Sequence, residues 1–211
     1  MKKRMLVLST GNINKVKEIK DILKDLPIEV VSKDELGLED IDVEEDGETL
    51  EENAIKKAKA IKDRVHGMVM ADDSGLFVDY LNGEPGIKSA RYSGPDANSE
   101  KNIQKLLKAL EGVPMDKRTA TFKTVIALIT EDGKVLTVTG ECKGRIGFEK
   151  KGHSGFGYDP LFIVDGYGKT FAELGNNIKN QISHRARALE KLKIVLTNII
   201  EDDIDEGNSC Q

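Results

Sequence analysis

Two adjacent carboxylates and a neighbouring hydroxyl are the residues most suited to chemistry in this chain. Asp72, Asp73 and Ser74 follow the apolar run Met68–Ala71, which has the length of a buried strand. Ligands of open α/β sheets bind at the carboxyl ends of strands, so we expect this strand to end at the carboxylates, at the mouth of a cleft. Paired carboxylates resist burial unless a cation compensates them, and Mg²⁺ is commonly held by one or two carboxylates plus substrate phosphates. A solvated Asp-Asp-Ser-Gly turn explains the same residues.

A polar loop near the start of the chain has the composition of a phosphate site. The run Met5–Ser9 predicts a first strand, and apolar residues at helical spacing predict a helix from about Val16 to Leu26. Between these elements lie Thr10, Gly11, Asn12, Ile13, Asn14 and Lys15. A loop that opens onto a helix N-terminus presents backbone N–H groups to an anion, and lysine adds a point charge suited to phosphate. A plain helix N-cap explains the loop about as well.

The next predicted helix leads directly to the carboxylates. It is expected over residues 49–67, because Thr49 and Glu52 match a capping box and Gly67 is a typical helix terminator. Lys57 on this helix either faces a phosphate cleft or is a solvated surface lysine. The acidic run 44–46 precedes the helix, so one of its carboxylates could reach a metal ion.

The middle of the chain supplies scaffold. We expect a short strand over 76–80, a turn at Asn82-Gly83 and a helix over about 99–110 capped by Asp96 or Asn98. Two strands over 118–130 and 134–143 are separated by Asp132-Gly133, which predicts a hairpin.

Two further motifs have the composition of a ligand site. Phe156, Gly157, Tyr158 and Asp159 form a glycine-rich loop before a strand. Glycines allow close approach of a backbone to a ligand, and an aromatic ring there can stack on a nucleobase. Core packing of the two aromatic residues is the equally good alternative.

The second motif is cationic and lies where a helix disfavours cations. Ser183 is a plausible N-cap of the last helix, so His184 and Arg185 would occupy its first turn, and Lys179 precedes them. Cations at a helix N-terminus oppose the helix dipole. We expect an anionic or carbonyl-bearing ligand to remove this conflict.

Length and composition set the broad class. The 211 residues suit a single domain of two lobes over residues 1–200, followed by an acidic tail over 201–211 that we expect to be frayed. The net charge of −5 argues against a sequence-independent nucleic-acid binder. Cys142 and Cys210 suggest no disulfide framework. Apolar runs are too short for a membrane span or a signal-peptide core, so we expect a cytoplasmic protein.

Taken together, five motifs resemble the Ham1 family of inosine triphosphate pyrophosphatases. They are STGNINKVKEI at 9–19, EENAIKKA at 51–58, ADDSGLFVDYLNGEPGIKSARYSG at 71–94, SGFGYDPLF at 154–162 and ISHRARAL at 182–189. The resemblance runs from about Met5 to Leu196. It implies an α/β fold with a twisted mixed sheet in two lobes, flanking helices and a central cleft. It also implies a homodimer that hydrolyses ITP, dITP and XTP with Mg²⁺, between the α and β phosphates, to the monophosphate and pyrophosphate.

The resemblance also assigns roles to single residues. The triphosphate would be held by the loop Thr10–Lys15 together with Lys57, and Ser74 would touch substrate. Glu45 and Asp73 would bind Mg²⁺, with Asp73 also the proton acceptor and Asp72 a supporting charge. A register shift by one residue, to Glu44, stays open. The base pocket would comprise Phe156, Gly157, Tyr158, Asp159, Lys179, His184 and Arg185. No nucleic acid or membrane partner is implied.

Two rival functions use overlapping residues. A Maf-like nucleotide pyrophosphatase would act on other bases, and the FGYD and SHR motifs argue against it. A nucleotide-binding sensor without catalysis would need the lysines and the base pocket but not Asp73, so an intact Asp-Asp-Ser-Gly favours the enzyme.

Overall fold

One mixed sheet organises the molecule. The computed structural model describes residues 3–96 and 98–208, with side chains through Glu201. In this part of the chain the strands form a seven-stranded sheet in the order β2-β1-β3-β5-β6-β7, with β4 paired to β3. The strands are β1 (Arg4–Leu8), β2 (Ile28–Ser32), β3 (Met68–Val78), β4 (Pro85–Gly86), β5 (Thr119–Ile129), β6 (Val135–Ile146) and β7 (Phe162–Val164). The β1 strand is parallel to both of its neighbours, and the other pairings are antiparallel.

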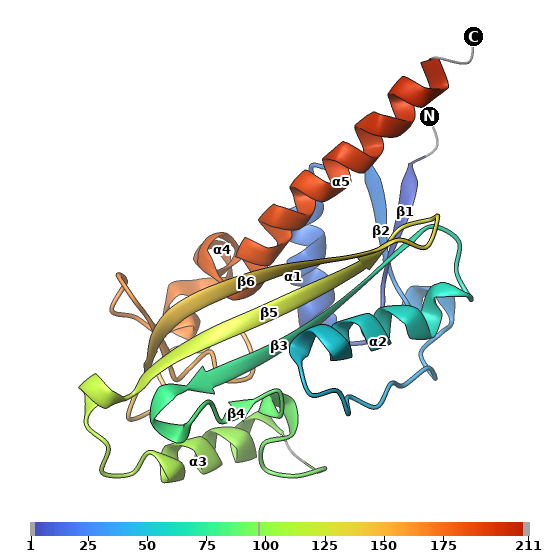
Figure 1. Ribbon diagram of the computed structural model, residues 1–211. Coiled ribbons are helices and arrows are strands. Elements are labelled where there is room, and N and C mark those ends of the chain that lie inside the picture. Colours follow the sequence, from blue (N-terminus) through green and yellow to red (C-terminus); the bar gives the residue numbers. More distant parts are fainter. Residues whose placement is uncertain (1–2, 97, 209–211) are drawn as a thin grey trace.

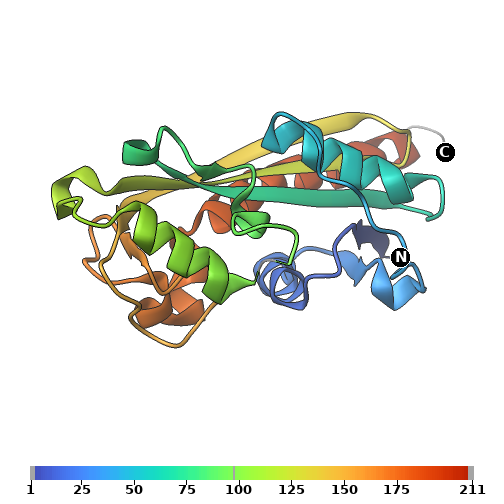
Figure 2. The same ribbon diagram turned by 90° about the horizontal axis from the view of Figure 1, so that it is seen from below.

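Helices cover both faces of the sheet and build two lobes. They are α1 (Ile13–Leu23), α2 (Leu50–Lys62), α3 (Ser99–Ala109), α4 (Phe171–Ile182) and α5 (His184–Asn208). The long strands β3, β5 and β6 have α2 on one face and α5 on the other (Figure 1). Below them, β1, β2 and α1 lie at one end, and α3 and α4 lie at the other (Figure 2). Separate apolar cores fill the α3–α4 end and the α1–α5 end, so the long strands connect two lobes.

The strand of the paired carboxylates is longer than predicted. Asp72 and Asp73 lie inside β3, which continues to Val78, so the prediction that the strand ends at them was wrong. The β5 strand pairs with every residue of β3 from Val69 to Val78 and keeps it extended. The β1 strand, by contrast, pairs with β3 only as far as Met70. The carboxylates therefore lie just beyond the carboxyl end of β1, where the neighbouring strand stops.

Two helix predictions need correction. The α2 helix ends at Lys62 and not at Gly67. Its capping box is incomplete, because Thr49 accepts from the Glu52 amide while the Glu52 carboxylate accepts from Glu48 and not from Thr49.

The α4 helix was not predicted. It carries the full capping box of Thr170 and Glu173, the sequence signal that would have revealed it. Gly175 interrupts it with a φ of 78°, which weakens the helical pattern.

Most of the scaffold agrees with the sequence. The hairpin of β5 and β6 is confirmed, as is α3, whose N-cap is Asn98. The α5 helix continues to Asn208 through the segment expected to fray, and residues 209–211 lie outside the described part of the chain. Among the described helices, none combines the length and the apolar character that crossing a bilayer requires.

Candidate active site

A cavity of about 470 Å³ lies at the carboxyl end of β1, between the lobes. Most of the residues assigned from sequence line it. They are Thr10, Gly11, Asn12, Lys15, Glu45, Lys57, Asp73, Ser74, Phe156, Gly157, Tyr158, Asp159, Lys179, His184 and Arg185. Ile13, Asn14 and Asp72 are absent from the lining. Segments far apart in the chain thus meet around a single space, large enough for a small molecule.

The loop after β1 is both a helix cap and part of the cavity wall. Asn12 caps α1, and its side chain accepts hydrogen bonds from the amides of Asn14 at 3.0 Å and Lys15 at 3.2 Å. Thr10 accepts from the Asn12 amide at 3.2 Å. These three amides are therefore satisfied within the loop, and Lys15 adds an ammonium group at the cavity.

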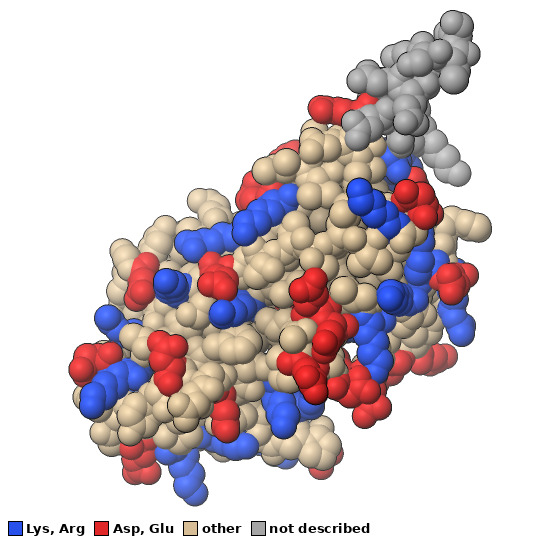
Figure 3. Space-filling model, viewed as in Figure 1, with Lys and Arg blue, Asp and Glu red and all other residues tan. Residues whose placement is uncertain are grey.

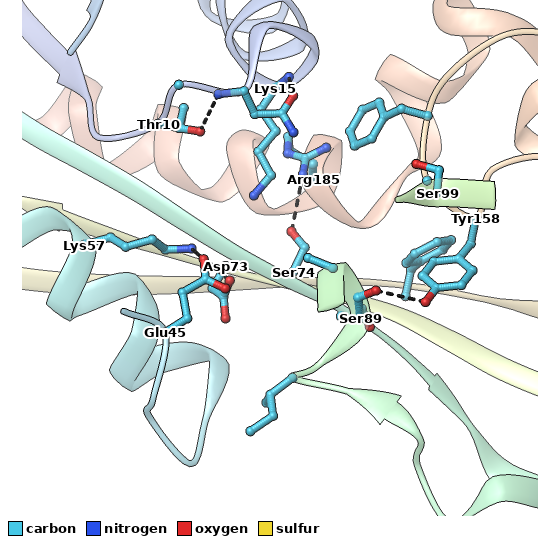
Figure 4. A pocket seen from close by; sticks show the side chains of 18 of the residues that line it. Thr10, Lys15, Glu45, Lys57, Asp73, Ser74, Ser89, Ser99, Tyr158 and Arg185 are labelled. Carbon is cyan, nitrogen blue, oxygen red and sulfur yellow. Dashed lines mark hydrogen bonds and ion pairs between the residues drawn. The ribbon is translucent and has the colours of Figure 1, made fainter. Parts of the chain in front are cut away.

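A lysine joins two carboxylates on one wall of the cavity. The Lys57 ammonium lies 2.9 Å from Glu45 Oε1 and 2.8 Å from Asp73 Oδ1. Figure 4 shows Lys57 and Glu45 reaching Asp73 from the same side. Glu45 is half-buried whereas Glu44 is exposed, so the register with Glu45 facing the cavity is the one observed. Arg91 binds Glu45 from the opposite side, at 3.1 Å from Oε2.

Burial and charge act against each other in this group. Burial raises the pKa of Asp73, although Lys57 partly offsets it. Burial has the same tendency at Glu45, but there Lys57 outweighs it and the pKa is lowered. Burial disfavours the Lys57 charge, yet Asp73 and Glu45 overcome this and raise its pKa. Of the two carboxyl groups that contact Lys57, Asp73 is thus the one more ready to take up a proton.

Asp72 is buried beneath the cavity wall and binds two of its cations. Its carboxylate lies 3.2 Å from the Lys15 ammonium and 3.1 Å from the Arg185 guanidinium. Burial opposes its charge, but Lys15 and Arg185 prevail, so the pKa of Asp72 is lowered well below its usual range. Asp72 therefore orients Lys15 and Arg185, and its lowered pKa does not suit a general base.

The expected conflict at the start of α5 is resolved within the protein. Arg185 pairs with Asp72 and, at 2.5 Å, with Glu18 of α1, so a bound anion is not required to compensate it. Ser183 caps the helix by accepting from the Ala186 amide.

His184 is buried and neutral. Burial and the nearby Arg185 hold its pKa well below 6.5. Its ring stacks on Phe122 at 4.6 Å between centroids, with 10° between the planes. His184 lines the cavity, and among the described residues its Nδ1 has no hydrogen-bond partner.

In the glycine-rich loop, one aromatic residue packs in the core and the other lies at the cavity. Tyr158 is buried, and its hydroxyl donates to the Ser89 carbonyl at 2.9 Å, so it is a core residue. Phe156 is half-buried and lies 4.3 Å beneath the Lys179 ammonium, at the cavity. Asp159 fixes this arrangement by accepting from Lys179 at 2.6 Å and from the Phe156 amide at 2.8 Å.

Sequence reasoning assigned no role at the site to three residues that the structure places there. Glu18 lies beside the apolar stripe of α1 and pairs with both Lys179 and Arg185. Asn53 contacts Asp73, and Arg91 binds Glu45. Arg91 lies in a Gly-, Pro- and Ser-rich loop over 83–94, and from sequence it could be functional or could support the fold. Nothing in the local pattern marks Glu18 or Asn53, because the charged partners of both lie on other elements.

The carboxylates fit a magnesium ion. Among the described residues no cluster of three or more potential side-chain ligands occurs. Glu45 and Asp73 nevertheless lie together at the cavity, and a single ammonium bridges them, so a cation is accommodated between them. Two carboxylates are what Mg²⁺ uses when phosphates complete its coordination.

This fold and site define an α/β protein with a cleft suited to a nucleotide: cations and carboxylates on one wall, an aromatic ring and a neutral imidazole on the other. The Ham1 family pattern matches residues 6–195, and the chain belongs to this family.

Close relatives extend over nearly the whole chain. A dITP/XTP pyrophosphatase of Caldanaerobacter subterraneus subsp. tengcongensis is 53% identical over 94% of this chain and 98% of its own. That of Clostridium perfringens is 52% identical over 94% and 100%. The solved structure of the Staphylococcus aureus Ham1 protein is 42% identical, with a TM-score of 0.82 over 92% of this chain and 99% of the other.

Proposed function

We propose that this protein hydrolyses ITP, dITP and XTP, with Mg²⁺, to the monophosphate and pyrophosphate. The observation that carries this proposal is the cavity itself, where Lys15, Lys57, Glu45 and Asp73 meet Phe156 and the base-pocket residues. The family membership and the dITP/XTP pyrophosphatase relatives support the same reaction. On the resemblance alone we also propose a homodimer and a cytoplasmic location.

Neutralisation of phosphate charge is the first task of the site. Phosphoanhydride hydrolysis is catalysed mainly by positioning and by electrostatic stabilisation. Lys15 and Lys57 direct ammonium groups toward the cavity. Glu45 and Asp73 would hold the Mg²⁺, which supplies further positive charge for the phosphates.

Activation of water is the second task. Water adds across the α–β anhydride, so it must lose a proton as its oxygen bonds to phosphorus and pyrophosphate leaves. Asp73 suits the role of proton acceptor because it faces the cavity and burial raises its pKa toward the working range of a general base.

Selection of the base is the third task. Hypoxanthine and xanthine carry a carbonyl at position six, where adenine carries an amino group. A neutral imidazole carries one N–H, and Nδ1 of His184, beside Arg185, has no partner among the described residues, so His184 can donate to a carbonyl placed against it. An amino group in the same place would leave a buried donor unpaired, which costs about 1–3 kcal/mol.

Phosphorus NMR of the products tests the proposal. With Mg²⁺, the wild type should release pyrophosphate from ITP and little from ATP, and Asp73→Asn should lose the activity while still binding nucleotide. Orthophosphate as the first product would place the cut at the terminal phosphate and refute the proposal. Nucleotide binding without turnover in the wild type would favour the sensor.

A further inference from the structure

Asn53 is a fully buried polar residue on the sheet-facing side of α2. Its exposed fraction is 0%, and its neighbours Leu50, Ala54 and Ala58 belong to the core between α2 and the sheet. A buried amide costs free energy unless hydrogen bonds replace those with water, so its partners are informative.

The amide of Asn53 connects the two segments that would bind Mg²⁺. Its Nδ2 donates to Asp73 Oδ2 at 3.2 Å. Its Oδ1 accepts from the Gly47 amide at 2.9 Å, two residues after Glu45. A side chain on α2 thus fixes the Glu45 loop and the Asp73 carboxylate with respect to each other.

Asn53 and Lys57 divide the two oxygens of Asp73 between them. Lys57 lies one helical turn after Asn53 and contacts Oδ1, whereas Asn53 holds Oδ2. A neutral donor orients a carboxylate without cancelling its charge, so Asp73 stays available to a cation. Asn53 does not itself line the cavity, and its effect on a ligand must pass through Asp73 and the loop.

The loop is shaped to meet Asn53 closely. A Cβ atom at Gly47 would lie 2.6 Å from Asn53 Oδ1 and 3.0 Å from the Cβ of Glu52. A larger residue at position 47 would therefore push the loop and the amide apart. The close contact between the loop and α2 therefore requires glycine at position 47.

We propose that Asn53 is the positioning residue of the magnesium site, setting the orientation of Asp73 and, through Gly47, the place of Glu45. This inference rests on the proposed function. Outer-shell hydrogen bonds to metal-binding carboxylates typically matter by about 10–100-fold in metal affinity or activity, and the test measures that range.

Three variants test the contact between Asn53 and the loop, two by changes on α2 and one by a change at Gly47. Asn53→Leu removes both hydrogen bonds at similar volume. Asn53→Asp keeps the acceptor for Gly47 but replaces the donor to Asp73 with a carboxylate. Gly47→Ala disturbs the contact from the loop. The matched control is Thr170→Val, which removes the buried cap of α4 and lies outside the cavity lining.

Metal binding is measured without turnover. Calorimetry follows Mn²⁺ binding in the presence of an ITP analogue with a methylene group between the α and β phosphates. We expect about 10–100-fold weaker Mn²⁺ binding in the three variants and wild-type binding in the control. In turnover assays, the Mg²⁺ concentration for half-maximal rate should rise in parallel, while KM for ITP at saturating Mg²⁺ stays near the wild-type value.

The possible results separate this inference from the function on which it rests. Wild-type Mn²⁺ affinity in Asn53→Asp and Gly47→Ala, with or without a loss of stability, would show that Asn53 is only a structural residue. If Asn53→Leu does not fold, those two variants decide. A wild type that neither binds Mn²⁺ with the analogue nor releases pyrophosphate would instead overturn the proposed function.

Discussion

Charged side chains at the cavity form ion pairs with each other before any ligand binds. Lys57 lies between Glu45 and Asp73, and Lys15 lies against Asp72. In the proposed reaction Mg²⁺ would replace part of the compensation that Lys57 gives, and the phosphates would receive the ammonium groups. The free protein thus holds its charged groups in place, which reduces the ordering required when a nucleotide binds.

His184 makes stability depend on pH. Its pKa lies well below 6.5 in the folded protein, because burial disfavours the charged ring. As pH falls below 6.5 the unfolded chain takes up a proton that the folded protein does not, so stability decreases. Between pH 7 and pH 5 this group should remove up to about 2 kcal/mol from the free energy of unfolding. Urea unfolding of wild type and His184→Phe at both pH values isolates the effect.

The quantity compared is the stability that wild type and His184→Phe each lose between pH 7 and pH 5. Phenylalanine can keep the stacking on Phe122 but does not titrate. His153→Gln is the control, since His153 is exposed, and it should keep the wild-type pH dependence. If His184→Phe loses as much stability as the wild type on acidification, the neutral buried histidine is the wrong explanation.

Residue types were easier to predict than their pairings. Asp73, Lys15, Lys57 and Arg185 were selected because carboxylates, lysines and glycine-rich loops have recognisable chemistry, and all four line the cavity. Glu18 was missed because one glutamate on a lysine-rich helix is typically solvated, whereas its partners Lys179 and Arg185 lie more than 160 residues further along the chain.

At the scale of elements, a close contact between β6 and α5 places the base-pocket residues. Gly140 of β6 faces the start of α5, where a Cβ atom would lie 2.1 Å from the His184 carbonyl oxygen and 2.4 Å from the Ala188 nitrogen. These are backbone atoms, so no side chain can move aside. The absence of a side chain at Gly140 allows α5 to lie directly on the sheet.

Gly140→Ala should displace the start of α5 and with it His184 and Arg185. Overpacking of this kind costs about 1–3 kcal/mol, measured by urea unfolding. Because the base pocket moves while Asp73 stays on β3, we expect KM for ITP to rise more than kcat falls. Gly133→Ala is the control: its φ of 88° strains alanine but nothing lies within 4 Å, so it should cost stability without changing KM. Equal KM in both variants would contradict the assigned role of Gly140.

The ends of helices and strands were predicted wrongly where contacts distant in sequence, and not the local pattern, determine them. The helix α3 was predicted over about 99–110 and is observed over Ser99–Ala109. The prediction ended the β3 strand at the carboxylates, because the local residue types favour a turn there. Pairing with β5 keeps the chain extended beyond them. The α4 helix was missed because Gly175 interrupts its pattern.

At the scale of the whole molecule, buried charges link the two lobes. On the face in Figure 3 basic and acidic side chains are interspersed over the surface. At and beneath the cavity wall, buried side chains form a continuous chain of ion pairs: Asp159 to Lys179, Lys179 to Glu18, Glu18 to Arg185, Arg185 to Asp72 and Asp72 to Lys15. Glu18 lies within this chain on α1 of one lobe, and its partner Lys179 is on α4 of the other.

Glu18→Gln should therefore be far more destabilising than the loss of a surface pair. Removal of one member of a buried ion pair costs up to about 3–5 kcal/mol when its partner is left uncompensated. The cost should lie below that upper end here, because Lys179 keeps Asp159 and Arg185 keeps Asp72. Glu100→Gln, which removes an exposed partner of Lys150, should leave urea unfolding unchanged. Because Glu18 and Lys179 act on each other, Glu18→Gln combined with Lys179→Met should cost less than the sum of the single changes. Strict additivity would show that the Glu18–Lys179 pair does not help to hold the two lobes together.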